Sequence, residues 1–281
     1  MRLKLKVIQF LKNLLGYSNT VKIKQAFFKQ KYRFDELHLI YELLKGIRNG
    51  VMIDVGAHYG SSLFPFYQKG WDILAFEPDE VNRSVLKTLI NPKKIKIFPY
   101  GVGNEYKEKV NFYRSTESSG ISGLSPFTSG HELADNAVTI VTLRDIIADE
   151  GINEVTFLKV DTEGHDLFVL QGFPWEVCKP NIVMVEFEDF KTEKLGYNYH
   201  DMAKYFIEKG YTVYLSEWEP ITKYGVSHTW RTLSAYPCEL QDPKGWGNLI
   251  AFHEPPDSKI VNKYLSIFNT TLIEKDNNKY S

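Results

Sequence analysis

Short apolar segments alternate with helical segments through most of this chain, and this alternation restricts the fold more than any other feature. Buried-type strands are expected at residues 51–55, 71–76, 95–100, 157–160 and 182–187. Helical patterns are expected at residues 34–44, in a stretch that ends at 69, and at 80–90 and 164–170. Strands and helices that alternate at this spacing form βαβ units. The chain is therefore expected to be an α/β protein with a mostly parallel central sheet, covered by helices on both faces.

The last part of the chain has a different pattern. Residues 211–215 and 249–252 are strand-like with no convincing helix between them, which indicates an antiparallel pair at one edge of the sheet. The segment between them, 217–247, has a length typical of a functional loop. Several of its side chains are expected either to pack against the face of a sugar or to anchor the loop. They are His228, Trp230, Arg231, Tyr236 and Trp246. We expect a main domain at residues 46–256, a helical extension at 1–45 and a polar tail at 257–281.

Charge and cysteine content argue against several classes of protein. The 34 basic residues nearly balance the 35 acidic ones, so no global field favours nucleic acid. No apolar run approaches the roughly 20 residues of a membrane-spanning helix. Cys178 and Cys238 match neither a redox pair nor a zinc-ligand spacing, so a reducing cytoplasm is the expected location.

Both ends of the chain carry amphipathic segments. Residues 1–17 combine four basic side chains with apolar residues at helical spacing. Such a helix either packs on its own domain or rests on a membrane surface, and we favour packing. The patch at residues 260–272 docks either on the domain or on a partner.

The segment Asp54-Val55-Gly56-Ala57-His58-Tyr59-Gly60 joins a strand to a helix at the expected carboxyl edge of the sheet. The chain turns tightly there, and a ligand approaches the backbone most closely where side chains are absent, as at Gly56 and Gly60. A dinucleotide fingerprint would need glycine at positions 58 and 61, where this chain has His58 and Ser61. The cradle for a pyrophosphate is therefore incomplete.

An acidic residue, Glu77, ends the second expected strand, where a carboxylate accepts hydrogen bonds from the ribose hydroxyls of a nucleoside. A ribose site without a pyrophosphate cradle suits S-adenosylmethionine, whose amino-acid end Gly56 would admit. Ser61 and Ser62 are expected to cap the following helix. For Asp54 the alternative is a role in ordering the local loop. The candidate cofactor-binding residues are Asp54, Gly56, Ala57, Gly60, Glu77, Val102 and Asn104.

A cluster of ionisable groups follows an apolar strand in the run Leu158-Lys159-Val160-Asp161-Thr162-Glu163-Gly164-His165-Asp166. With Asp54-Val55-Gly56-Ala57 and Glu77-Pro78, this run resembles the FkbM family of S-adenosylmethionine-dependent methyltransferases. The family's Lys-x-Asp-x-Glu-Gly block, followed by Leu and Gly, is represented here by Lys159, Asp161, Glu163, Gly164, Leu170 and Gly172. The resemblance covers about residues 34–252. It implies a Rossmann-like class I methyltransferase fold and O-methylation, often of sugar hydroxyls in glycans.

Methyl transfer to a hydroxyl requires alignment of the reacting atoms and removal of the hydroxyl proton. The candidate catalytic residues are Asp161, Glu163 and His165. The alternative for Glu163 is a structural ion pair with Lys159 that orders the turn. The family often has a further acidic residue two positions after the glycine, and in this chain that residue is the shorter Asp166.

Two further features lie near the expected active edge. Glu186 and Glu188 end the next strand, and with Asp161 they form a set of hard oxygens of the kind that binds a divalent metal. Acidic clusters at strand ends also bind substrate hydroxyls, and no metal is expected. The polar loop 118–123 either closes over the cofactor or acceptor, or is a solvated connection.

The favoured function is an S-adenosylmethionine-dependent O-methyltransferase that acts on a small-molecule or glycan acceptor. The alternative enzyme is an NAD-dependent sugar-modifying oxidoreductase, and the incomplete dinucleotide fingerprint argues against it. The other alternative, a non-catalytic nucleoside-binding protein, has no need of ionisable groups at strand ends. Neither the acceptor nor the oligomeric state follows from the sequence.

Overall fold

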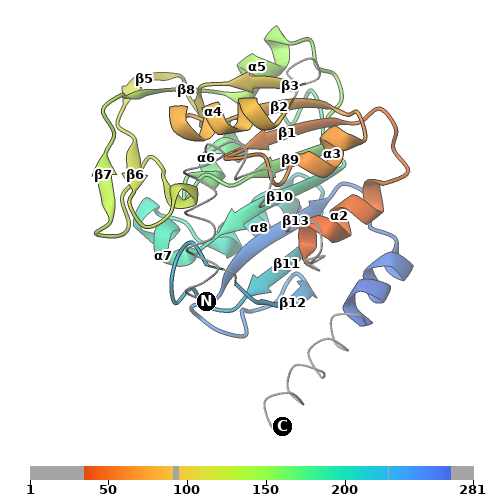
Figure 1. The fold of residues 1–281 in the computed structure, drawn as a ribbon. Coiled ribbons are helices and arrows are strands. Elements are labelled where there is room, and N and C mark those ends of the chain that lie inside the picture. The colour runs from red at the N-terminus through yellow and green to blue at the C-terminus, as the bar shows by residue number, and fades with distance from the viewer. Residues whose placement is uncertain (1–34, 91–94, 227, 267–281) are drawn as a thin grey trace, which may run out of the picture.

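The computed structural model describes residues 35–90, 95–226 and 228–266, whose arrangement Figure 1 shows. In this part of the chain, eight strands form one central sheet in the order β12-β11-β13-β10-β9-β1-β2-β3. From one edge to the other, these strands are β12 (Trp230–Ala235), β11 (Thr212–Trp218), β13 (Trp246–Phe252), β10 (Ile182–Phe187), β9 (Phe157–Val160), β1 (Val51–Val55), β2 (Asp72–Phe76) and β3 (Ile95–Phe98).

The sheet confirms the predicted α/β class with a mostly parallel centre and an antiparallel edge. Strands β10, β9, β1, β2 and β3 pair in parallel. Strand β13 pairs antiparallel with both β10 and β11, which was the expected edge pair. Strand β12 extends this edge and was not predicted, because it lies within the segment 217–247 that we interpreted as a loop.

Helices cover both faces of the sheet, because side chains alternate between two cores along each strand. The helices that cover the sheet are α2 (Glu36–Leu44), α3 (Phe64–Gln68), α4 (Glu80–Leu89), α5 (Leu143–Asp149), α6 (Asp166–Gln171) and α8 (Tyr199–Glu208). Ile53 and Val55 belong to a core packed against α5, α6 and α8, whereas Met52 belongs to a core packed against α2, α3 and α4.

One helix begins differently from the expectation, and another was not predicted. Helix α3 begins after Leu63 without a side-chain cap, so the predicted capping by Ser61 and Ser62 is wrong. Ser62 instead donates a hydrogen bond to the buried Asp54 at 2.6 Å. Helix α8 was not predicted, although Asn198 begins it with a capping box.

An insertion between β3 and β9 forms two small sheets. One contains β4 (Gly101–Val102), β8 (Val138–Val141) and β5 (Lys107–Val110). The other contains β6 (Tyr113–Ser115) and β7 (His131–Leu133), with the short 3-10 helix η2 (Ser119–Ile121) between them. In Figure 1 this insertion stands beside the central sheet and brings η2 towards its middle.

Segments from both ends of the described chain pack on the second core. Leu39 and Ile40 of α2 are buried there, as are Val261 and Tyr264 of the helical residues 258–266. The expected amphipathic helix at residues 1–17, with its membrane alternative, and residues 267–281 lie outside the described residues. Among the described residues, no helix has the length and hydropathy that a membrane span requires.

Candidate active site

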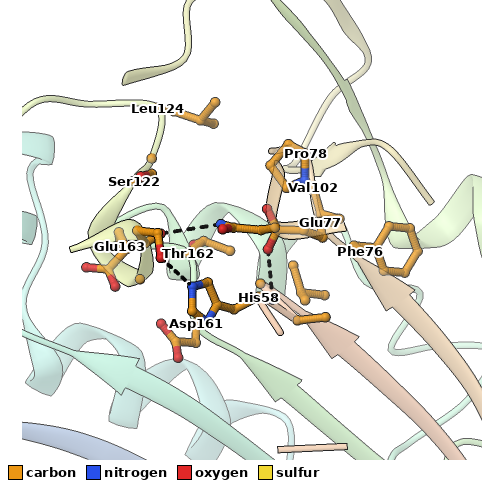
Figure 2. A pocket seen from close by; sticks show the side chains of 18 of the residues that line it. His58, Phe76, Glu77, Pro78, Val102, Ser122, Leu124, Asp161, Thr162 and Glu163 are labelled. Carbon is orange, nitrogen blue, oxygen red and sulfur yellow. Dashed lines mark hydrogen bonds between the residues drawn. The ribbon is translucent and has the colours of Figure 1, made fainter. Parts of the chain in front are cut away.

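A cavity of about 210 Å³ lies at the carboxyl ends of the central strands (Figure 2). Its walls come from the turns after β1, β2 and β9, from β4 and from the η2 loop. The predicted site residues that line it are Gly56, Ala57, Glu77, Val102, Asp161 and Glu163. Elements far apart in the sequence therefore meet at the edge of the sheet where α/β folds bind ligands.

Gly56 adopts a left-handed backbone conformation, with φ of 78°, immediately after β1. A Cβ atom at this position would lie 1.8 Å from the backbone oxygen of Asp161. The N–H groups of Gly56 and Ala57 both donate to the carbonyl oxygen of Phe76 at 3.0 Å. The turn is thereby pressed between β2 and β9, and only glycine fits at its first position.

Asp54 lies beneath this turn and does not line the cavity. It is fully buried, and burial raises the pKa of its carboxyl group. Lys159 lies 3.5 Å from Asp54 and 3.1 Å from Asp161, and its Nζ donates to the carbonyl oxygen of Gly56 at 3.2 Å. Asp54 thus orders the Gly56 turn through Lys159. The alternative considered from the sequence, an ion pair between Lys159 and Glu163, is not formed, because Lys159 is paired with these two aspartates.

Glu77 lines the cavity with both carboxylate oxygens already bound to backbone N–H groups. Oε2 accepts from the N–H of His58 and Oε1 from that of Asp79, both at 2.8 Å. Burial raises the pKa of Glu77 to about 7. The carboxylate is fixed in place, and a carboxylate has lone pairs beyond the two used by these N–H groups.

Asn82, which sequence reasoning missed, lines the same end of the cavity. Its side chain is buried at 3% exposure, and within the described part of the chain its Oδ1 has no hydrogen-bond partner. Buried carbonyl oxygens without a partner are rare, because desolvation is costly. The available signal was its place in the first turn of α4, beside Glu77.

The η2 loop is attached to the turn that follows β1. Ser119 lies 2.9 Å from Nε2 of His58 and 3.1 Å from the hydroxyl of Tyr59. Arg114 donates to Asp79 at 2.5 Å. Burial lowers the pKa of His58 to about 4, so this histidine is neutral and anchors the loop.

Glu163 follows β9 in a left-handed backbone conformation, with φ of 60°. The carboxylate of Asp166 fixes this turn by accepting from the N–H of Thr162 at 2.8 Å and from the N–H of Gly164 at 3.1 Å. Tyr197 donates to the carbonyl oxygen of Gly164 at 2.7 Å. Asp166 therefore stabilises the turn by accepting hydrogen bonds from its backbone, and its short side chain suits that role.

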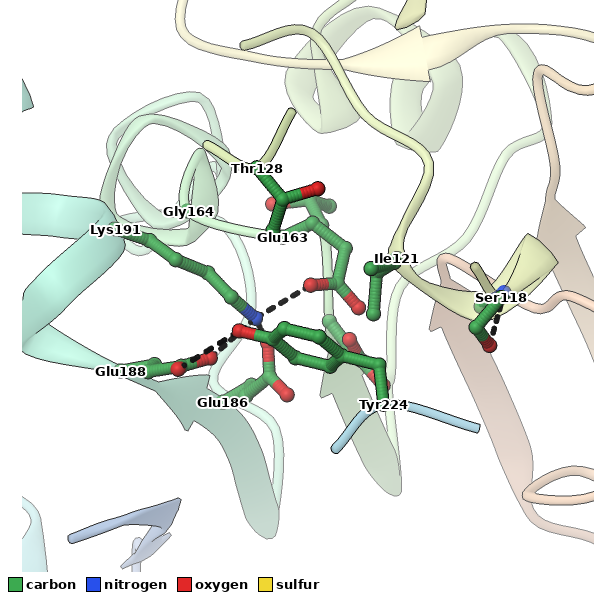
Figure 3. A network of polar contacts seen from close by, with 12 residues as sticks. Ser118, Ile121, Thr128, Glu163, Gly164, Glu186, Glu188, Lys191 and Tyr224 are labelled. Carbon is green, nitrogen blue, oxygen red and sulfur yellow. Dashed lines mark hydrogen bonds and ion pairs between the residues drawn. The ribbon is translucent and has the colours of Figure 1, made fainter. Parts of the chain in front are cut away.

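The Glu163 side chain bonds to Lys191, whose Nζ lies 2.5 Å from Oε2 (Figure 3). Burial raises the pKa of Glu163 to about 7, although Lys191 opposes this rise. A carboxyl group with a pKa near neutrality is suited to exchange protons at physiological pH.

Besides Asp54, three predicted site residues lie outside the cavity. Gly60 faces the core, where a Cβ would lie 2.6 Å from Leu86. Asn104 is exposed, and its amide donates to Gln171 at 3.3 Å. His165 does not line the cavity and bonds to the hydroxyl of Ser125 at 2.9 Å, while burial lowers the pKa of its imidazole.

The aromatic segment 217–247 contributes none of its predicted side chains to the lining of this cavity. Trp230 donates to the hydroxyl of Ser216 at 2.8 Å, and Trp246 donates to a backbone oxygen at 3.0 Å. Arg231 is paired with three carboxylates, among them the fully buried Glu217. These contacts anchor the segment to the antiparallel edge.

Comparison with known proteins assigns this site to a class of enzyme. The family model described as Methyltransferase FkbM domain matches residues 54–213, which is more than half of the chain. The protein is an S-adenosylmethionine-dependent methyltransferase. It belongs to the FkbM methyltransferase family, as the Lys159 to Gly164 block indicated. The NAD-dependent and non-catalytic alternatives are set aside by this membership.

No curated protein matches the chain. Among solved structures, an rRNA methylase from Streptococcus thermophilus is 7% identical with a TM-score of 0.41, covering 78% of this chain and 94% of its own. A precorrin-6y C5,15-methyltransferase from Geobacter metallireducens is 9% identical with a TM-score of 0.38, covering 79% and 93%. Likeness at this level does not bear on the acceptor.

The cavity residues fit S-adenosylmethionine. The Gly56 turn forms one wall of the cavity, and Glu77 offers acceptor positions for ribose hydroxyls. The Oδ1 of Asn82, which has no partner among the described residues, calls for a hydrogen-bond donor from a ligand. Glu77, Asn82 and the Gly56 turn would therefore hold the nucleoside and amino-acid parts of the cofactor.

Proposed function

We propose that this methyltransferase methylates a hydroxyl oxygen of a sugar or glycan-type acceptor. The observation that carries the proposal is Glu163, a buried carboxyl group that lines the cofactor cavity and has a pKa raised to about 7. When bound, S-adenosylmethionine supplies a methyl group on a positively charged sulfur, which leaves as a neutral thioether. A hydroxyl acceptor must then lose its proton, and Glu163 is placed to receive it.

Glu163 suits the role of base better than the other two candidates. His165 lies outside the cavity and is bound to Ser125. Asp161 lines the cavity, but its side chain is 35% exposed and held 3.1 Å from Lys159. We assign to Asp161 the binding of an acceptor hydroxyl, which orients the reacting oxygen.

A hydroxyl-rich acceptor matches the polar side of the cavity. Ser122, Thr162 and Asp161 line it, and each carries an oxygen atom of the kind that hydrogen-bonds to sugar hydroxyls. The family resemblance points to the same class of acceptor. Small sugars and glycans are therefore the first acceptors to test.

The test uses S-adenosylmethionine with a labelled methyl group and pairs of sugars that differ in one hydroxyl. We expect label to enter a free sugar and to be absent from its counterpart that lacks the reactive hydroxyl. Equal labelling of both members of every reactive pair would contradict transfer to oxygen. The Glu163→Gln variant, assayed in parallel, reports whether any label depends on the proposed base.

Asn82→Leu is expected to weaken binding of S-adenosylmethionine about 3- to 10-fold, because one hydrogen bond to a buried acceptor is lost. Leucine keeps the approximate volume of the side chain. Isothermal titration calorimetry measures the effect, with the exposed Ser84→Ala on the same helix as the control. An unchanged dissociation constant for Asn82→Leu would show that Oδ1 does not contact the cofactor.

A further inference from the structure

A buried lysine lies behind Glu163, outside the cofactor cavity. Helix α7 (Asp189–Thr192) follows β10 after a single residue and turns the side chain of Lys191 back over the end of that strand (Figure 3). The Lys191 side chain is 3% exposed. A lysine is almost never buried to this extent unless it is paired.

Three carboxylates surround the ammonium group of Lys191. Nζ lies 2.5 Å from Glu163, 2.7 Å from Glu188 and 3.5 Å from Glu186. Its remaining surroundings are aromatic: the ring centre of Phe127 lies 4.9 Å away and that of Tyr224 lies 5.9 Å away. Both kinds of neighbour favour a cation at this point.

The two rings come from segments far apart in the sequence. Phe127 belongs to the segment between η2 and β7, and Tyr224 to the loop between β11 and β12. They contact each other edge to face at 5.9 Å, and the Tyr224 hydroxyl donates to Glu188 at 3.1 Å. These segments thus close a compartment around the ammonium group and exclude water from it.

The carboxylates around Lys191 are arranged in a way that also suits a metal ion. Asp161, Glu163 and Glu186 each offer an oxygen atom within 4.8 Å of the others. The ammonium group of Lys191 already approaches Glu163 and Glu186, and Asp161 has its own partner in Lys159. Lys191 and Lys159 therefore supply the positive charge that such a cluster of carboxylates requires.

Lys191 also constrains the backbone that presents Glu163 to the cavity. A Cβ on Gly164 would lie 3.2 Å from the Cβ of Lys191, so α7 packs directly on the Glu163 turn. The left-handed conformation of Glu163 is costly and persists only where its surroundings impose it. Contact with α7 is one of those surroundings, and the ion pair with Lys191 directs the carboxylate.

We propose that Lys191 is a positioning residue for methyl transfer, and that its ammonium group takes the place of a metal ion and holds Glu163 ready to accept a proton. This inference rests on the proposed function, in which Glu163 is the base. The acceptor proton moves from the hydroxyl oxygen to Glu163. Lys191 keeps its own proton throughout.

The charges around Glu163 determine what removal of Lys191 will do. Burial raises the pKa of Glu163, and the attraction of Lys191 lowers it. The acidic groups that raise it further include Asp161 from the end of β9 and Asp166 from α6. Glu186 on β10 also faces this cluster, and burial raises its pKa well above the usual range. Among the described residues, Lys191 is the only cation paired with Glu163, so removal of Lys191 is expected to raise the pKa of Glu163.

The experiment compares the wild type with Lys191→Met and Lys191→Arg. Because Lys191→Met leaves three buried carboxylates uncompensated, the double variant Lys191→Met/Glu188→Gln removes one carboxylate together with the cation. Lys194→Met, an exposed position near the end of the same segment, is the matched control. Binding of S-adenosylmethionine by calorimetry reports whether each variant keeps the folded cofactor site.

The decisive readout is an infrared titration of the protonated carboxyl band that Glu163→Gln removes. In the wild type and Lys194→Met this band is expected to titrate near pH 7. In the double variant its midpoint moves up by about 1–3 pH units, the effect of losing an opposite charge at close range. The acidic limb of the pH–rate profile is expected to move to higher pH as well. In Lys191→Arg, which keeps the positive charge, both the carboxyl midpoint and the acidic limb are expected to stay near their wild-type values.

An unchanged carboxyl midpoint in a double variant that binds cofactor normally would overturn the inference. Mn²⁺ titration provides a second decision. Stoichiometric binding of Mn²⁺ to the wild type, abolished by Glu186→Gln, would show that a metal ion rather than Lys191 serves these carboxylates. The infrared titration needs no acceptor, so failure of the proposed function, with no hydroxyl methylated, is separate from failure of this inference.

Discussion

Replacing Glu163 with glutamine is expected to lower kcat about 10²- to 10⁴-fold, the usual contribution of a positioned general base. Glutamine keeps the shape of the side chain but cannot accept the proton of the acceptor hydroxyl. Because the carboxyl group has a pKa of about 7, wild-type activity is expected to fall as the pH drops through neutrality and Glu163 becomes protonated. The variant loses this acidic limb. Steady-state kinetics between pH 5 and 9 measure both effects.

The affinity for S-adenosylmethionine separates loss of chemistry from loss of the site. Glu163→Gln is expected to bind the cofactor with nearly the wild-type dissociation constant. In the wild type the Glu163 carboxylate is bonded to Lys191, and we expect it not to hold the cofactor. Asp161→Asn serves as the comparison: we expect it to reduce turnover through poorer acceptor binding while retaining the acidic limb. A Glu163→Gln enzyme with normal kcat and an unchanged pH profile would show that the base lies elsewhere.

The Glu77→Ala variant is expected to raise the dissociation constant of S-adenosylmethionine about 100-fold or more. Two hydrogen bonds from the ribose to a charged group are lost, each worth about 1.5–3 kcal/mol. The backbone N–H groups of His58 and Asp79 also lose their acceptors, so the turn that lines the cavity is loosened. Calorimetric titration at pH 8, where the Glu77 carboxylate is ionised, measures the change.

Glu80→Ala is the control for this variant. Glu80 begins the helix that follows Glu77, carries the same charge and is exposed. Its removal should leave cofactor affinity within about 2-fold of the wild type, as is usual for surface positions. Equal losses of affinity in the Glu80→Ala and Glu77→Ala variants would mean that net charge, rather than contact with the ribose, governs binding.

The centre of the fold was predictable because its strands are short runs of mainly apolar residues. Strands β1, β9 and β10 have the expected bounds, since each is buried on both faces and contains a single charged residue. Strand β12 mixes polar and apolar residues without strict alternation, within an aromatic segment rich in glycine. Its pairing with β11 is a long-range contact that local pattern does not report.

The cofactor end of the site was partly predictable for a related reason. Gly56 and Glu77 lie at strand ends, where the topology alone brings them to one edge of the sheet. Asn104 follows a strand in the same way but turns towards Gln171 on α6, away from the cavity. The direction of a side chain after a strand depends on the packing of the next turn, which the sequence pattern does not encode.

The pairing of charges was the least predictable feature. Lys159 is nearer to Glu163 in sequence, yet it is directed beneath the Gly56 turn towards Asp54. Lys191 reaches Glu163 only because α7 folds back over β10. Local spacing on a strand or helix identifies neighbours within one element, whereas this buried pair joins two elements through the tertiary fold.

The most direct test of the central claim is the chemical identity of the methylated atom. Wild-type enzyme is incubated with S-adenosylmethionine carrying a ¹³C-labelled methyl group and a mixture of sugar and glycan acceptors, and the product is analysed by NMR. A labelled carbon bonded to a sugar oxygen, formed by the wild type and strongly reduced with Glu163→Gln, is the predicted result. A labelled methyl group bonded to nitrogen or carbon, formed equally well by Glu163→Gln, would contradict the account.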